Sequence, residues 1–217
     1  LDFTVPDQPG APVWILRYGS EEENYRPKIS RIENGATEDI ALKDLEERFF
    51  IQRIGATQDG LLILQGYESG LRVFDPKTGK EVNSFDEYDG YFLLQGDVLT
   101  ACSTSEKRVM QYDLQKDELI WEAEDAPLTE WDFAATDGEA VYIANAGGVY
   151  RIAAGGSLWE KMVDGELTSL RVPSMGVQAL SLLNGDPVVL LFSSEGASKL
   201  MRYVYDETVP TLPANEL

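Results

Sequence analysis

The residues in this sequence best suited to chemistry are short runs of carboxylates. Asp86-Glu87-Tyr88-Asp89-Gly90 holds three acids and a glycine, and Glu122-Ala123-Glu124-Asp125 holds three more acids. Carboxylate oxygens are the ligands that Ca²⁺ prefers. The run at Asp86 lacks the D-x-[DN]-x-[DN]-G spacing of an EF-hand loop. A solvated loop between structural modules is therefore the favoured interpretation, and we expect no metal centre.

A binding surface is nevertheless expected on the loops that carry these acids. In folds built from repeated modules, the connections between successive modules gather at one end, and loops on a rigid scaffold often carry function. Trp131 follows the loop at 125–130 and is placed to reach such a surface. The predicted surface for a partner or a cation comprises Asp86, Glu87, Asp89, Asp125, Glu130 and Trp131.

The sequence lacks the residues that several classes of enzyme need for catalysis. The chain of 217 residues has no histidine and one cysteine, which excludes Ser-His-Asp and Cys-His nucleophiles, His-ligated zinc and an imidazole pH switch. Cys102 ends an apolar run, which predicts a buried, unreactive thiol. We expect no catalytic residue and no organic cofactor. A propeller-type glycosidase or lyase with carboxylates near the central channel is the alternative, because the sequence does not give the distance between two carboxylates.

The charge balance narrows the range of partners. The net charge is −20, from 38 acids against 18 bases, which opposes binding to nucleic acid and to anionic membranes. No apolar run approaches the roughly 20 residues of a membrane span. The expected partner is a protein, a small molecule or a carbohydrate, and we expect the chain to be a monomer.

The elements that must position these residues recur along the chain. A tight turn, a continuous apolar stretch and an alternating strand repeat with a period of about 40 residues, which is typical of a four-stranded propeller blade. The turns are Asp59-Gly60, Gly96-Asp97, Asp137-Gly138 and Gly185-Asp186. The alternating third strands begin at Lys28, Leu71, Val109, Val149 and Leu200.

This pattern predicts an all-β fold, a β-propeller of about five four-stranded blades. Residues 1–11 form an approach segment, 12–207 the propeller and 208–217 a linker-like tail. The first module lacks a first strand and the fifth lacks a fourth, so Leu1–Val5 or Thr208–Leu212 should pair to complete them. Short helices are allowed only at Asp39–Arg48 and Asp164–Leu170.

Aromatic and polar residues on the strands have structural and functional interpretations. Trp14, Trp121 and Trp159 are expected to pack between blades, although aromatic side chains also line sugar-binding faces. An enzyme would need polar groups from several first strands to converge on the channel. The candidates for that position are Arg53, Gln95, Asp132 and Gln178, which differ in type.

One segment carries a family resemblance. Leu71–Val82 reads LRVFDPKTGKEV, in which an aromatic-Asp pair leads into a D-x-x-T-G-K turn. It resembles the blade repeat of quinoprotein-like (PQQ-repeat-like) and related bacterial β-propellers. Val109–Asp113 followed by Lys116–Trp121 is a degenerate copy. The resemblance implies a propeller, but the chain lacks the length, the recurrent tryptophan signature and the vicinal cysteines of quinoprotein dehydrogenases, so their cofactor chemistry is not implied.

A looser resemblance concerns cellular context. Acidic, histidine-poor propeller segments are similar to the N-terminal parts of some Gram-positive lipoproteins, which precede a solute-binding module. That resemblance implies an extracytoplasmic location, either secreted or on the cell surface. The expected function is that of a non-catalytic binding or scaffold domain of an exported bacterial protein.

Overall fold

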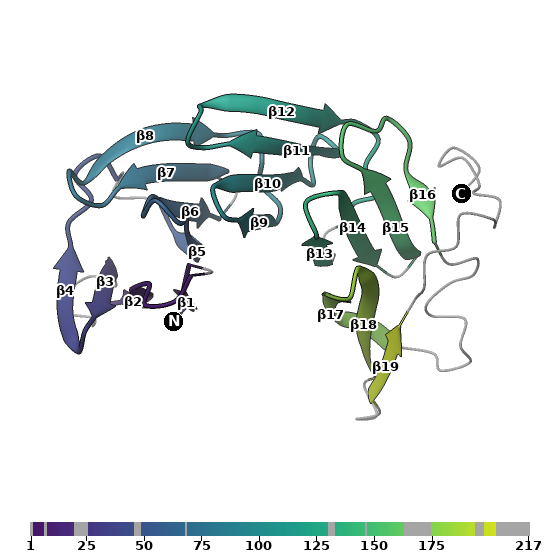
Figure 1. Cartoon of the computed structure of the whole chain (residues 1–217), viewed down its shortest axis with the longest axis horizontal. Coiled ribbons are helices and arrows are strands. Elements are labelled where there is room, and N and C mark those ends of the chain that lie inside the picture. Colours follow the sequence, from purple (N-terminus) through teal and green to yellow (C-terminus); the bar gives the residue numbers. More distant parts are fainter. Residues whose placement is uncertain are drawn as a thin grey trace. The chain divides into compact units, whose positions relative to one another are not determined.

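The fold was obtained as a computed structural model that describes residues 2–6, 8–19, 26–45, 49–67, 69–129, 133–145, 147–162, 175–193 and 198–202. All regular elements in these residues are β-strands, and they form five antiparallel sheets (Figure 1). The chain divides into two compact units. Unit 1 comprises Leu1–Leu99 and Tyr112–Glu118, and unit 2 comprises Thr100–Gln111 and Leu119–Leu217.

The predicted all-β fold is confirmed. No helix occurs in the described residues, and none of them therefore provides an apolar helix long enough to cross a bilayer. Of the two segments where a short helix was allowed, the first is wrong over its described residues 39–45, because Asp39 and Ile40 end a strand and 41–45 form no helix. The second, 164–170, lies outside the described residues.

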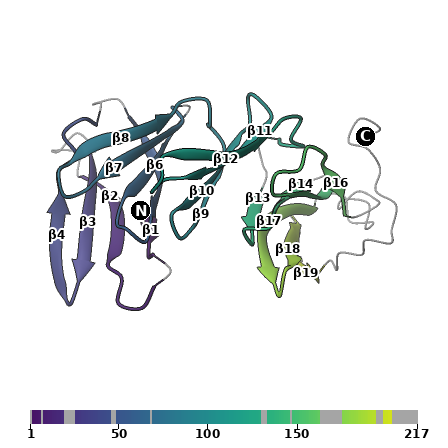
Figure 2. The ribbon, with the colours of Figure 1, turned by 45° about the horizontal axis from the view of Figure 1, so that its top comes forward.

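The first sheet has the order β1-β2-β3-β4, and Figure 2 shows the four strands side by side. Phe3 of β1 pairs with Ile15 of β2, so the segment near the start of the chain supplies the first strand that the first module lacked. Asn34 and Gly35 form the turn that joins β3 to β4, with φ of 50° and 80°. The strands are β1 (Asp2–Thr4), β2 (Val13–Tyr18), β3 (Pro27–Glu33) and β4 (Ala36–Ile40).

In the second sheet, the burial of each strand accounts for its pattern of apolar and polar residues. Its strands are β5 (Ile51–Ala56), β6 (Leu62–Gly66), β7 (Leu71–Asp75) and β8 (Lys80–Phe85). Every residue of β6 is buried, because a strand inside a blade is covered on both faces. Exposed and partly buried residues alternate along β8, as expected of an outer strand. In the turn between β7 and β8, Asp75 Oδ1 accepts from the Lys77 amide at 2.9 Å, and Asp75 Oδ2 accepts from the Thr78 hydroxyl at 2.9 Å.

The third sheet repeats this design. Its strands are β9 (Phe92–Gln95), β10 (Val98–Ser103), β11 (Arg108–Asp113) and β12 (Glu118–Ala123). Asp113 occupies the place of Asp75: its Oδ1 accepts from the Gln115 and Lys116 amides at 3.1 and 2.9 Å. The degenerate copy seen in the sequence therefore forms a turn with the same carboxylate-to-amide bonds.

The fourth and fifth sheets follow the same order of strands. The fourth contains β13 (Phe133–Thr136), β14 (Ala140–Asn145), β15 (Gly148–Ala153) and β16 (Glu160–Lys161). The fifth contains β17 (Met175–Leu183), β18 (Asp186–Ser193) and β19 (Ser198–Arg202). The turn predicted at Gly185-Asp186 is one residue too late, since Asn184 and Gly185 have φ of 53° and 84° and Asp186 begins β18. The segment 208–212, proposed as a closing strand, lies outside the described residues.

Each unit has its own core. Unit 1 packs Trp14, Leu62 and Phe74 among the side chains of the first two sheets, and unit 2 packs Trp121 and Trp159 with its apolar strands. The expected packing role of these three tryptophans is confirmed by exposures of 2%, 9% and 3%. Cys102 is also buried, as predicted, while its lack of reactivity stays a prediction.

Candidate functional site

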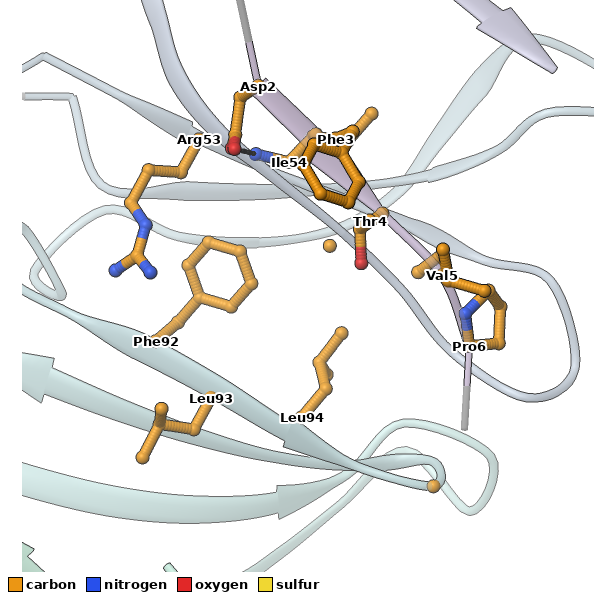
Figure 3. Close-up of a pocket in the computed structure, with 13 residues that line it drawn as sticks. Asp2, Phe3, Thr4, Val5, Pro6, Arg53, Ile54, Phe92, Leu93 and Leu94 are labelled. Carbon is orange, nitrogen blue, oxygen red and sulfur yellow. Dashed lines mark hydrogen bonds between the residues drawn. The ribbon is translucent and has the colours of Figure 1, made fainter. Parts of the chain in front are cut away.

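The strands that position the candidate site are the first strands of three successive sheets. β1 lies beside β5, and β5 lies beside β9, all within unit 1. In a propeller, the blades surround a central channel, and the first strand of each blade is nearest to it. A pocket of about 290 Å³ is formed by residues of these three strands and the segments next to them (Figure 3).

One wall of the pocket comes from β1 and the residues after it. Phe3 and Val5 are exposed by 68% and 48%, which is high for apolar side chains. The strand is held in place on two sides. It pairs with β2, and Asp2 Oδ2 accepts a hydrogen bond from the Ile54 amide of β5 at 3.0 Å, drawn as a dashed line in Figure 3. The apolar wall is therefore anchored to both neighbouring strands.

The opposite wall comes from β9. Phe92 is buried and Leu94 partly buried, and both line the pocket. They approach β5 closely at Gly55, where an added Cβ would lie 2.5 Å from Phe92 Cε2 and 2.8 Å from Leu94 Cδ1. A side chain at this position would have to displace the Phe92 ring and the Leu94 methyl group.

Arg53 of β5 is the cationic group of the pocket. Its Cζ lies 5.3 Å from the centre of the Tyr91 ring and 5.7 Å from that of Phe92. Such aromatic contacts hold a guanidinium by cation–π attraction while leaving its N–H groups unused. In the part of the chain that the structure describes, no hydrogen bond or ion pair engages this guanidinium. An arginine with five free donors can bind an anion.

Asp2 is the one carboxylate among the residues that line the pocket. No ion pair joins it to Arg53 in the described residues, so the two charges are separate features of the site. Glycoside hydrolysis in most families needs two carboxyl groups about 5–10 Å apart. The pocket can therefore hold a ligand by charge and apolar contact, but its described residues do not present that pair.

The sequence identified only part of this pocket. Arg53 was expected on a first strand and is confirmed there. Gln95 ends β9 and is exposed. Asp132 lies outside the described residues, and so does the side chain of Gln178. The wall of Phe3 and Val5 was missed, although the apolar alternation of Leu1–Val5 was a usable signal for a strand with one exposed apolar face.

The acidic surface predicted from the sequence is divided by the structure. Asp86, Glu87 and Asp89 share the connection between β8 and β9. Asp86 Oδ1 accepts from Arg72 Nη1, so this carboxylate is already engaged by a strand of its own sheet. Glu87 is exposed and Asp89 partly buried.

The remaining residues of that surface lie elsewhere. Asp125 follows β12 in unit 2, is exposed and has φ of 52°. Glu130 and Trp131 lie outside the described residues. Among the residues that are described, no three acidic or sulfur side chains are grouped so as to hold a metal ion. The structure thus brings three of the six predicted residues into one loop, and their role stays a prediction.

Carboxyl groups with shifted pKa values occur in the blade turns. The backbone hydrogen bond from Lys77 lowers the pKa of Asp75, with help from the Thr78 hydroxyl. The Lys116 side chain and amide lower the pKa of Asp113, and Lys116 Nζ lies 2.6 Å from its Oδ2. In each case the charged form is stabilised by donors of the same turn. These shifts are consequences of turn formation and do not mark a catalytic acid.

Comparisons with known proteins address the fold and not the chemistry. No family model matches the chain, and no curated protein matches it. Among solved structures, it is similar to the computationally designed Ika4 protein, with a TM-score of 0.54, 12% identity, and coverage of 73% of this chain and 94% of that one.

Two further structures are similar over most of this chain. The Cps50 (Swd1) β-propeller domain of Myceliophteria thermophila aligns with a TM-score of 0.59 and 15% identity over 89% of the chain. A chain of the mitotic checkpoint complex aligns with a TM-score of 0.60 and 12% identity over 93%. The chain spans 66% and 63% of those two proteins. Together with the four-stranded antiparallel sheets, this likeness confirms the predicted β-propeller fold. The quinoprotein-like and lipoprotein details stay predictions.

Proposed function

We propose that this protein is a non-catalytic β-propeller domain that binds a ligand or a partner's side chain in the pocket formed by β1, β5 and β9. The observation that carries the proposal is a concave site on three neighbouring first strands, where apolar side chains lie beside a cation that has no partner among the described residues. Concave apolar sites with a few convergent polar groups are the usual form of ligand pockets. First strands of a propeller are rigid supports for such a site.

Binding is favoured over catalysis by the chemistry of the pocket. The sequence contains no histidine, and the described residues that line the pocket include a single carboxylate. General acid–base catalysis needs a group with a pKa near the working pH, and hydrolysis of glycosides needs two carboxyl groups. These considerations support a binding role over the glycosidase or lyase alternative.

The proposal extends to cellular context. A propeller domain of an exported bacterial protein, within a solute-binding lipoprotein, is supported by the resemblance of the Leu71–Val82 repeat and by the net charge of −20. A high negative charge favours solubility and discourages adsorption to anionic surfaces. The gene sequence on both sides of these 217 residues tests the proposal. A lipobox encoded upstream supports it, and an adjoining domain that functions in the cytoplasm overturns it.

The experiment for the pocket uses two matched phenylalanines. Phe3 lines the pocket and is 68% exposed, whereas Phe50 is 66% exposed and is not among the pocket residues. Amide spectra of ¹⁵N-labelled protein are recorded with short-chain carboxylates, amines, alcohols and monosaccharides. We expect at least one class to shift the resonances of β1, β5 and β9, and to do so less in Phe3→Ala than in Phe50→Ala.

Three results would overturn the proposal. The first is that no probe shifts the resonances of these strands, and the second is that Phe3→Ala and Phe50→Ala behave alike. The third is turnover: release of nitrophenol from a panel of p-nitrophenyl glycosides, at a rate that follows the protein concentration, would establish an enzyme. Because both phenylalanines are largely exposed, neither substitution is expected to unfold the protein.

A further inference from the structure

We infer that the pocket of β1, β5 and β9 selects a small organic monocarboxylate with an apolar body, and that Arg53 binds its carboxylate. This inference rests on the proposed binding function and names the class of ligand. It combines the free donors of Arg53, the aromatic support beneath them and the apolar walls on either side (Figure 3).

The aromatic contacts orient the guanidinium. Its Cζ is within 6 Å of two rings, those of Tyr91 and Phe92. Contact of the guanidinium with the rings restricts its rotamers, and its planar fork can then receive a carboxylate with two parallel hydrogen bonds. Arg72, in contrast, is bonded to Asp86 and lies near Glu81. Arg53 differs from it in having no protein carboxylate as partner among the described residues.

The walls indicate what the rest of the ligand can be. Phe3 and Val5 line one side and Leu94 and Phe92 the other, while polar groups make up the larger part of the accessible surface. The apolar part favours a ligand with a short aliphatic or aromatic body. A volume of about 290 Å³ is at the lower end for ligand pockets. A chain of about six carbons is therefore a suitable probe.

The net charge makes the inference specific. A protein with a charge of −20 repels anions at long range, so general anion adsorption is not expected. An anion that binds must gain from contact with a particular cation. Binding of a carboxylate that depends on Arg53 thus distinguishes a built site from a non-specific effect.

The test compares hexanoate with hexanol, which share the apolar chain and differ in the carboxylate. Amide spectra of the wild type, Arg53→Gln and Arg17→Gln are recorded during each titration. Arg17 lies on β2 and pairs with Asp39 at 3.1 Å, outside the pocket, so Arg17→Gln removes the same charge elsewhere in unit 1. We expect hexanoate to shift resonances of β1, β5 and β9 and to bind about tenfold more weakly to Arg53→Gln, because hydrogen bonds to charged groups are lost. Arg17→Gln should bind as the wild type does.

The outcomes separate the inference from the proposed function. If hexanol shifts the same resonances with equal affinity, or if Arg53→Gln binds hexanoate unchanged, the pocket binds ligands but does not select carboxylates, and the inference is wrong. If amines or sugars bind there in place of hexanoate, the inference is likewise overturned while the proposed function stands. The comparison of hexanoate with hexanol on the wild type needs no variant, so it decides the matter even if Arg53→Gln does not fold.

Discussion

Gly79, in the turn between β7 and β8, offers a quantitative test of how the blades are joined. Its φ is +72°, a conformation that side chains rarely adopt. An added Cβ would also collide with the carbonyl oxygen of Ala41, in the segment that follows the first sheet. The same segment donates a hydrogen bond from the Lys43 amide to the Gly79 carbonyl at 2.8 Å. Gly79→Ala should therefore strain the turn and separate two neighbouring blades of unit 1.

The expected magnitude follows from two contributions. A left-handed backbone costs a residue with a Cβ roughly 1–2 kcal/mol. Overpacking against the backbone adds about 1–3 kcal/mol, which gives about 2–5 kcal/mol in total. For a chain of this length, each kcal/mol lowers the melting temperature by about 2–4 °C. We therefore expect a fall of about 4–20 °C.

Gly60→Ala is the matched control. Gly60 also has a positive φ, of +90°, but no atom lies within 4 Å of its added Cβ. Only the backbone cost applies, so its melting temperature should fall by about 2–8 °C. Both variants are measured by circular dichroism during heating and by urea unfolding. Equal losses of stability in the two variants would refute the inferred docking of the turn on the segment at Ala41.

The other predictions concern buried hydrogen bonds, pH and the acidic loop. Trp121→Phe should destabilise the protein by about 1–3 kcal/mol more than Trp14→Phe in urea unfolding. Trp121 Nε1 donates to Gln111 Oε1 at 2.8 Å, whereas Trp14 Nε1 is buried with no partner in the described residues. Equal losses of stability in the two variants would contradict this. The lowered pKa of Asp75 means that its contribution to stability is present above the unfolded-state pKa of about 3.9 and lost as the pH falls through the folded-state pKa. The stability difference between the wild type and Asp75→Asn should therefore shrink between pH 7 and pH 2, and a difference that is constant with pH would be evidence against the turn bonds. Calorimetry with a basic peptide should show weaker binding when Asp86 and Asp89, which share the connection between β8 and β9, are changed to Asn, and undiminished binding would place the binding surface elsewhere.

The sequence was most informative about the strands, for a physical reason. A strand inside a blade is covered on both faces, so β6 and β14 are continuous apolar runs that can be read directly. The turn after β7 was equally readable, because its Asp, Pro and Gly each have a specific conformational role there. The Asn-Gly preference of two-residue hairpins matches the turn at Asn184-Gly185, one residue before the predicted Gly185-Asp186.

The site was less predictable because its residues are distant in sequence. Asp2 and Ile54 are joined by a hydrogen bond across 52 residues, and no local pattern encodes that contact. Asp86 appeared in the sequence as a free acid of a loop, whereas the fold places Arg72 beside it. Arg53 was recognised as a polar residue on a first strand. Its contacts with the rings of Tyr91 and Phe92 depend on how two neighbouring sheets pack, which the sequence does not show.

The most direct test of the central claim is a crystal structure of the protein soaked with hexanoate. The account predicts the β-propeller fold, with the carboxylate oxygens about 2.7–2.9 Å from the Arg53 guanidinium nitrogens and the carbon chain between Phe3 and Phe92. Hexanoate bound only elsewhere, or Arg53 paired with a carboxylate of the protein itself, would contradict it.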